Sequence, residues 1–276
     1  TDGIIIKSKP FIDKDPNKIT GSFYIKTKFL KRNMKNAIDL LNTLLFDPFL
    51  DNKEQVHAIF NSLESDLASL IQEEGYLYSK YKGASQFSRY FALYELWEGL
   101  TFIDRLREIK DSDECESIIK DVYEQLFLKA HFQCSIIADK QSINEARDLM
   151  RPIIDKLNEN TDFEGINDYS FLDSICKSQE GDKIFYEFET MTNSTTSLCQ
   201  TIPYNSDLSI PISILASLLE TEFLYKQIRE KIGAYGVYCT HFAFPGLLSI
   251  SSHRDKDCIN CLKAYRSSIE KAARGE

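Results

Sequence analysis

The sequence predicts an α+β fold in which layers of helices pack on antiparallel-rich mixed sheets, with a first part that is mostly helical. Two observations predict this class. Long stretches place apolar residues at the helical period, and shorter ones alternate between apolar and polar residues, as half-buried strands do. In the second part the elements run strand, strand, helix, strand, strand, helix. This order predicts helices on one side of an antiparallel-rich sheet.

The first part opens with one predicted strand and continues in helices. Residues 20–30 alternate between apolar and polar side chains, which is typical of a half-buried strand. The helical period then predicts helices over 34–47, over 51–74 with Gly75 as the end, and over 76–108. The third of these is rich in aromatic residues. An aromatic stripe at this spacing is more typical of a helix core than of a ligand-binding site.

The rest of the first part predicts two helices separated by a strand. An amphipathic helix is expected over 112–130, a strand over 131–138, and then a helix capped by Ser142 and Glu145. No opening hairpin is evident in this first unit. We therefore expect its front half to lie outside this chain, which also ends within a helical pattern.

A loss of periodicity over 159–182 predicts a linker between two units. The elements expected after it are strands over 183–189 and 195–204, a helix over 209–229, strands over 234–242 and 246–253, and a closing helix from Asp257.

Composition and charge exclude several classes of function. With 43% hydrophobic residues the chain has material for a core, and no apolar run approaches the ~20 residues that span a membrane. The net charge of −9, with scattered Lys and Arg, argues against nucleic acid or a membrane as partner and is compatible with basic peptides. Seven cysteines without framework spacing predict free thiols in a soluble protein of a reducing compartment. No targeting signal is recognisable, so localisation is left open.

The most informative stretch is 224–236, which places Arg229 at the end of an apolar helix. Tyr235 follows just past Gly233, at the head of a strand. A guanidinium and a phenol brought together in this way can both donate hydrogen bonds to one carbonyl oxygen. A structural role is the alternative, because an Arg in a last helical turn complements the helix dipole and a Tyr is common in strands.

This stretch resembles the arginine/tyrosine signature of the pitrilysin superfamily of zinc metallopeptidases, which includes insulin-degrading enzyme. It is most similar to the presequence-peptidase and falcilysin branch, where an Arg, two residues and then Gly-Gly-Ala-Tyr-Gly follow one another. Ile232 stands where that branch usually has the first glycine. The turn at 98–100 and the residues 251–255 also resemble it, so the resemblance covers nearly the whole chain.

The resemblance implies that residues 1–160 are the rear part of a third domain and residues 161–276 the front part of a fourth. It implies a parent enzyme that degrades short unfolded peptides in an enclosed chamber, with Zn²⁺ and a Glu base held in the N-terminal half of the same protein. In that enzyme Tyr235 would donate to the scissile carbonyl oxygen, and Arg229 would hold the substrate carbonyl beside it.

No metal or cofactor site is expected within this chain. The zinc motif H-x-x-E-H of the superfamily is absent, because the four histidines are His57, His131, His241 and His253. Cys258 and Cys261 form a single C-x-x-C pair, and a structural zinc needs two such pairs or added histidines. The pair is more simply two small residues on one helix face. The isolated chain is therefore expected to be inactive.

Two other interpretations stay open at this point. The parent protein could be a non-catalytic pitrilysin homologue that binds peptides or serves as an assembly subunit, and the departure at Ile232 favours this alternative. The chain could also be an unrelated α+β binding module. In that case the 224–236 match would be a coincidence, and no helix–turn–strand would join Arg229 to Tyr235.

Overall fold

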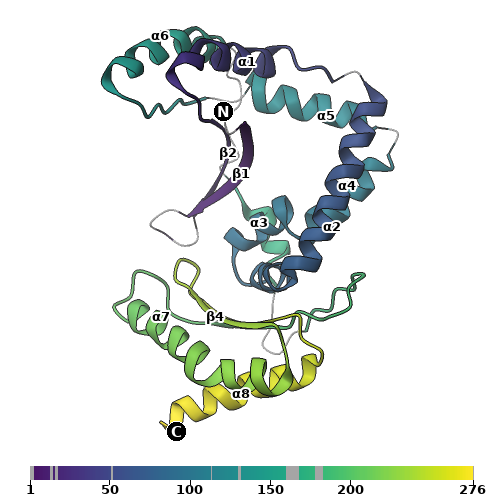
Figure 1. Cartoon of the computed structure of the whole chain (residues 1–276), viewed down its shortest axis with the longest axis vertical. Helices are drawn as coiled ribbons and strands as arrows, with labels where there is room; N and C mark the ends of the chain where they lie inside the picture. Colours follow the sequence, from purple (N-terminus) through teal and green to yellow (C-terminus); the bar gives the residue numbers. More distant parts are fainter. Residues whose placement is uncertain are drawn as a thin grey trace. The chain divides into compact units, whose positions relative to one another are not determined.

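Figure 1 shows the computed structural model of the chain, which describes residues 3–12, 15, 18–50, 52–112, 114–129, 132–159, 168–177 and 183–275. Within these residues the predicted α+β class is confirmed, with antiparallel strands following a largely helical first part. No helix in the described part of the chain is long and apolar enough to cross a membrane.

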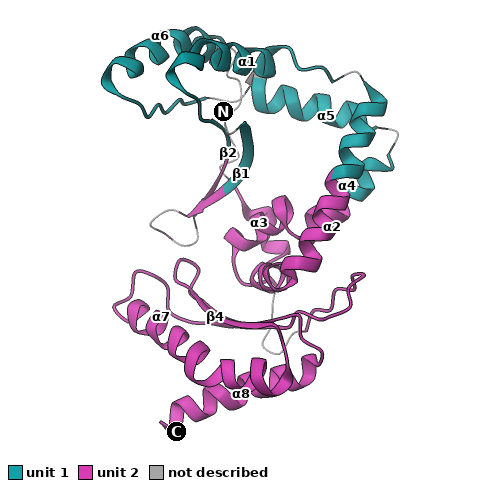
Figure 2. Ribbon diagram, in the orientation of Figure 1, with its two compact units in different colours: residues 1–9, 23–62, 106–167 teal, residues 10–22, 63–105, 168–276 magenta. Residues whose placement is uncertain are grey.

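The chain folds into two compact units that interleave along the sequence. Figure 2 shows one unit formed by residues 1–9, 23–62 and 106–167, and a second formed by residues 10–22, 63–105 and 168–276. The assignment of residues 1–160 and 161–276 to two domains of a longer protein stays a prediction.

Two strands pair at the beginning of the chain. The predicted strand at 20–30 is confirmed as β2 (Ile19–Thr27), whose residues alternate between half-buried and exposed after a buried Ile19. Its partner β1 (Ile4–Ile12) was not predicted, so the expectation that no hairpin opens the first unit is wrong. The run Ile4-Ile5-Ile6 lacks the alternation of a half-buried strand, and proline, here Pro10, is rare in central strands. The usual sequence signal for a strand is therefore missing.

The first unit has a core between two amphipathic helices, α1 (Met34–Phe46) and α6 (Lys140–Leu157). It also contains η1 (Lys31–Asn33), α5 (Cys115–Tyr123) and the π-helical η2 (Glu124–Lys129). The buried residues of this core are Met34, Ile38, Leu45, Ala146, Ile153 and Leu157. The helical spacing of Met34, Ile38 and Leu45 is the pattern that predicted α1.

Two predictions about residues 131–145 are wrong. The described residues 132–137 form no strand, and at their start the Asn158 side chain bonds to both the N–H and the C=O of Phe132, at 2.9 and 3.1 Å. The cap of α6 is Asp139, three residues before Ser142. Its Oδ1 accepts hydrogen bonds from the N–H groups of Gln141 and Ser142, both at 3.1 Å.

The predicted helix end at Gly75 agrees with a break inside α2 (Lys53–Ala84). Glu74 leaves the helical region there with φ −124° and ψ 27°, so α2 consists of two helices that meet at a kink. A Cβ on Gly75 would lie 2.9 Å from Ser194 Oγ, so the glycine permits a close approach at the kink. The helices α3 (Arg89–Glu98) and α4 (Leu100–Lys110) follow, separated by the predicted turn at Gly99.

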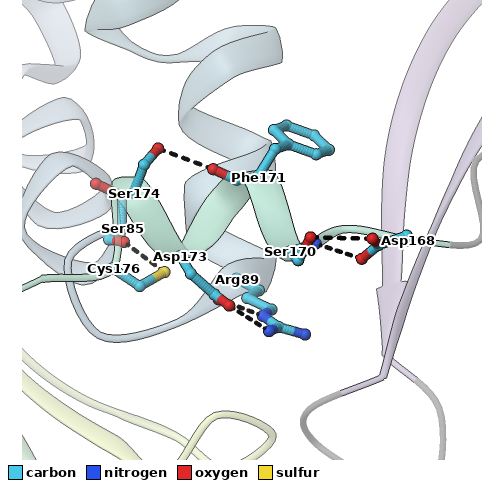
Figure 3. A network of polar contacts seen from close by, with 8 residues as sticks. All are labelled: Ser85, Arg89, Asp168, Ser170, Phe171, Asp173, Ser174 and Cys176. Atoms are coloured by element: carbon cyan, nitrogen blue, oxygen red, sulfur yellow. Dashed lines mark hydrogen bonds and ion pairs between the residues drawn. The ribbon is translucent and has the colours of Figure 1, made fainter.

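The described middle of the predicted linker is folded. Residues Ser170–Ser174 form a 3₁₀-helix, η3, that buries Leu172 completely. Figure 3 shows how it is tied to α3: Arg89 Nε and Nη2 donate to the two carboxylate oxygens of Asp173, both at 2.6 Å. A linker is therefore the wrong description for 168–177. The remainder of 159–182, apart from Glu159, lies outside the described residues.

The second unit contains a three-stranded antiparallel sheet of β3 (Thr196–Gln200), β4 (Gly236–Phe242) and β5 (Leu247–His253), in the order β3-β5-β4. The helix α7 (Ser209–Leu218) continues directly into the π-helical η4 (Leu219–Ile232), and Asp257 caps the last helix α8 (Cys258–Arg274). These elements confirm the predicted helix at 209–229 and the strands at 234–242 and 246–253. The predicted strand at 183–189 is wrong, because residues 183–188 are irregular.

Both faces of this sheet are covered, and the expected one-sided arrangement is therefore wrong. On one face Ile250 packs with α7, η4 and α8 in an apolar cluster. Figure 1 shows α7 and α8 along this side of the sheet. On the other face Ser79 of α2 donates to Thr196 at 2.7 Å, and Thr196 donates to Ser251 at 3.1 Å. The same face also carries Phe242 and Leu247, which pack with Phe91 of α3.

Candidate functional site

The link between η4 and β4 is a helix–turn–strand that fixes the backbone from Arg229 to Tyr235. Gly233 ends η4 in the left-handed region with φ +82°, and the N–H groups of Gly233 and Ala234 both donate to Ile228 O. Ile228 and Ala234 are buried in the apolar cluster, which anchors the segment on both sides of the turn. The single glycine is sufficient for the turn, and Ile232 instead packs against that cluster.

Arg229 and Tyr235 lie side by side on the exposed side of this segment. Arg229 Cζ is 5.9 Å from the centre of the Tyr235 ring and 5.3 Å from that of Tyr225. Tyr235 is 62% exposed. The predicted proximity of the two side chains is thus present, and the helix–turn–strand argues against a coincidental match. Their roles in binding and catalysis stay predictions.

Tyr235 contacts His253 at the end of β5 through both its backbone and its ring. The Tyr235 N–H donates to His253 O at 3.0 Å, and the two rings are 5.4 Å apart in an edge-to-face arrangement. The same imidazole packs edge-on against Tyr76 at 5.0 Å. Burial, with a smaller contribution from Arg254, lowers the pKa of His253 below its usual value, so the ring is neutral near pH 7.

A second guanidinium approaches Tyr235 that was not predicted as a site residue. Arg254 Cζ lies 5.6 Å from the centre of the Tyr235 ring. Arg254 follows β5, whereas Arg229 ends η4, so the two arginines reach the same ring from different elements. The signal that could have found Arg254 is its place within 251–255, a stretch that resembles the same family.

The histidines and cysteines of the described residues offer no metal centre. No group of three or more His, Cys, Asp or Glu side chains in the described part of the chain is arranged to hold a metal ion. His241 uses both ring nitrogens within the fold, at 2.9 Å from Ser213 Oγ and 3.0 Å from Ile202 O. Cys261 is buried in the apolar cluster, where burial raises its thiol pKa to about 11. His131 lies outside the described residues.

The aromatic stripe of the helices at 76–108 packs as a core. Phe91 is buried with Ala84 and Leu247, and its ring lies 4.8 Å from that of Phe242. Lys80 is enclosed by the rings of Tyr76, Tyr81 and Phe242, at 5.3 to 5.6 Å from their centres. This arrangement agrees with the core interpretation of the stripe.

Comparison with known proteins relates this α+β chain to a peptidase-associated region. Residues 1–109 match a family model for the region associated with peptidases of family M16, subfamily C. The matched region includes the aromatic helices and ends before Arg229 and Tyr235.

Individual relatives extend the similarity over most of the chain. The chain is 25% identical over 251 residues to the mitochondrial presequence protease of Schizosaccharomyces pombe, covering 90% of this chain and 25% of that protein. The mitochondrial presequence protease of Xenopus laevis is 22% identical, with 90% and 26% covered. A Clostridium perfringens protein named HypA is 26% identical, with 91% and 25% covered.

These matches confirm the resemblance to the presequence-peptidase branch of the pitrilysin superfamily. The chain spans about a quarter of the length of the relatives it matches.

Proposed function

We propose that this chain is part of a zinc metalloendopeptidase that degrades short unfolded peptides in an enclosed chamber. In this proposal the chain supplies Arg229 and Tyr235, and it is inactive by itself. Its similarity to presequence proteases supports the peptidase class. The single observation that carries the site is the pair of exposed side chains held by the core-anchored turn at Gly233.

The zinc implied by the family does not fit the described residues of this chain, which hold no suitable ligand group. In the proposed parent it would be bound by residues in the N-terminal half of the protein. The contribution of this chain is hydrogen bonding. Tyr235 would donate its O–H to the scissile carbonyl oxygen as negative charge develops there, and Arg229 would hold the adjacent backbone carbonyl.

Tyr235→Phe in the full-length protein tests this role. The change removes one hydroxyl from an exposed ring and leaves the contact with His253, so stability should change little. A lost oxyanion donor costs about 3 kcal/mol, and kcat should therefore fall by roughly 10²- to 10³-fold with a smaller change in KM. Tyr225→Phe is the matched control, because it removes a hydroxyl beside the same guanidinium. A well-folded Tyr235→Phe enzyme with unchanged kcat would remove this residue from the site.

The isolated 276-residue chain provides a second test. Incubated with a quenched fluorescent peptide library and zinc, it should release no fluorescence. Turnover that a chelator abolishes would contradict the proposed inactivity of the chain alone.

A non-catalytic pitrilysin homologue that binds peptides or assists assembly is the second candidate, and Ile232 in place of a glycine is the observation that favours it. The full-length sequence separates the two, because H-x-x-E-H upstream of this chain would identify the enzyme.

A further inference from the structure

Arg254 has a backbone conformation that arginine seldom adopts. Its φ is +51°, and among the described residues it is the only residue other than glycine with a positive φ. Such a conformation is unfavourable for a residue with a Cβ, and it persists where the surrounding structure imposes it.

The neighbours of Arg254 hold this conformation on both sides. Asn193 and Asp255 exchange two backbone hydrogen bonds, of 2.8 and 2.9 Å. Asp255 is fully buried and accepts a hydrogen bond from Ser252 Oγ, and His253 on the other side is also buried. The Arg254 side chain is exposed between these fixed neighbours. The fold therefore presents this guanidinium at the surface from a rigid backbone.

The guanidinium is presented beside Tyr235, where Arg229 already lies. The Cζ atoms of Arg254 and Arg229 are 5.6 and 5.9 Å from the centre of the Tyr235 ring. Neither guanidinium forms an ion pair with a carboxylate in the described part of the chain, although the protein as a whole carries a net charge of −9. Two cations without anionic partners beside one exposed ring form a local positive site on an acidic protein.

We infer that Arg254 is a specificity-determining residue that binds a carboxylate of the peptide lying against Tyr235. The carboxylate is either the C-terminus of the peptide or an Asp or Glu side chain. The planar fork of a guanidinium matches the two oxygens of this group, and a bound anion also offsets the repulsion between the two arginines. This inference rests on the proposed function, because it places the peptide against Tyr235.

The test uses the full-length protein and two matched pairs of peptides. One pair differs by Glu or Gln beside the scissile bond, and the other by a free or an amidated C-terminus. Arg254→Asn removes the cation and keeps a residue that tolerates positive φ. Lys256→Asn is the control, since it removes the same charge from an exposed residue two positions further on.

The wild-type protein should prefer the carboxylate member of at least one pair, and that pair identifies the source of the carboxylate. Arg254→Asn should reduce this preference in kcat/KM by about 3- to 10-fold, and Lys256→Asn by less than about 2-fold. Arg254→Lys should retain part of the preference, and added salt should weaken it in the wild type. The ratio of the Kd values for the two peptides of a pair, measured by fluorescence anisotropy, tests the inference without requiring turnover.

A preference that is absent in the wild type, or unchanged in Arg254→Asn, would overturn this inference. The proposed function fails separately, through full turnover in Tyr235→Phe. If Tyr235→Phe loses turnover on all four peptides while Arg254→Asn leaves the preference within each peptide pair unchanged, only the role of Arg254 is refuted.

Discussion

Gly233→Ala should destabilise the turn that positions Arg229 and Tyr235. The glycine has φ +82° and ψ 26°, and a Cβ built on it would meet no atom within 4 Å. The cost of alanine is therefore conformational and not steric, about 1–2 kcal/mol for a residue with a Cβ in the left-handed region. Because alanine also restricts the unfolded chain by about 0.4–1 kcal/mol, the net loss of unfolding free energy should be about 1 kcal/mol.

Gly275→Ala provides a control with the same conformational cost at another helix end. Gly275 has φ +72° and ends α8, also with no atom within 4 Å of an added Cβ. Urea unfolding should give similar losses of stability for the two variants. In the full-length protein only Gly233→Ala should also lower kcat, because it moves Tyr235 relative to Arg229. Equal kcat for both variants would refute the link between this turn and the site, and an unchanged unfolding free energy would refute the strain argument.

Two further predictions concern buried groups. Glu95 is 1% exposed, and its Oε1 accepts from Thr101 N at 2.9 Å and pairs with Lys82 Nζ at 3.2 Å. Glu95→Ala should thus cost about 3 kcal/mol in urea unfolding, against about 0.5 kcal/mol for the exposed Glu270→Ala, and a loss below about 1 kcal/mol would contradict this. Burial lowers the pKa of His253 in the folded protein, so the unfolded chain binds more protons than the folded one as pH falls through about 6.5. The free energy of unfolding should therefore decrease as pH falls through that window. His253→Gln should show a shallower fall in melting temperature between about pH 7.5 and 5.5, and an identical pH dependence would exclude His253 as its source.

Predictions from the sequence succeeded where the signal is local and periodic. The apolar residues of α1 recur within a single helix, so their burial follows from the helix itself. The helix ends were less predictable, because several residues can cap the same turn. Asp139 caps α6 in place of Ser142, whereas the end predicted at Gly75 agrees with the break at Glu74.

Strands depend on partners that the sequence does not identify. Residues 183–188 alternate as a strand should, but they pair with no strand in the described part of the chain. By contrast, β3 lies within the predicted strand at 195–204 and pairs with β5 over five residues. Strand propensity describes a residue's fit to a pleated surface, and the distant pairing determines whether that surface exists.

The same distinction divides the candidate site. Arg229 and Tyr235 are six positions apart on one helix–turn–strand, so a sequence pattern can specify both together with the glycine between them. The place of Arg254 instead depends on the bridge between Asn193 and Asp255, whose residues are far apart in the sequence. Arginine has no preference for the left-handed region that would mark the position. A positive φ imposed by long-range hydrogen bonds is therefore information that only the fold provides. It supports the inference that Arg254 acts beside Tyr235 together with Arg229.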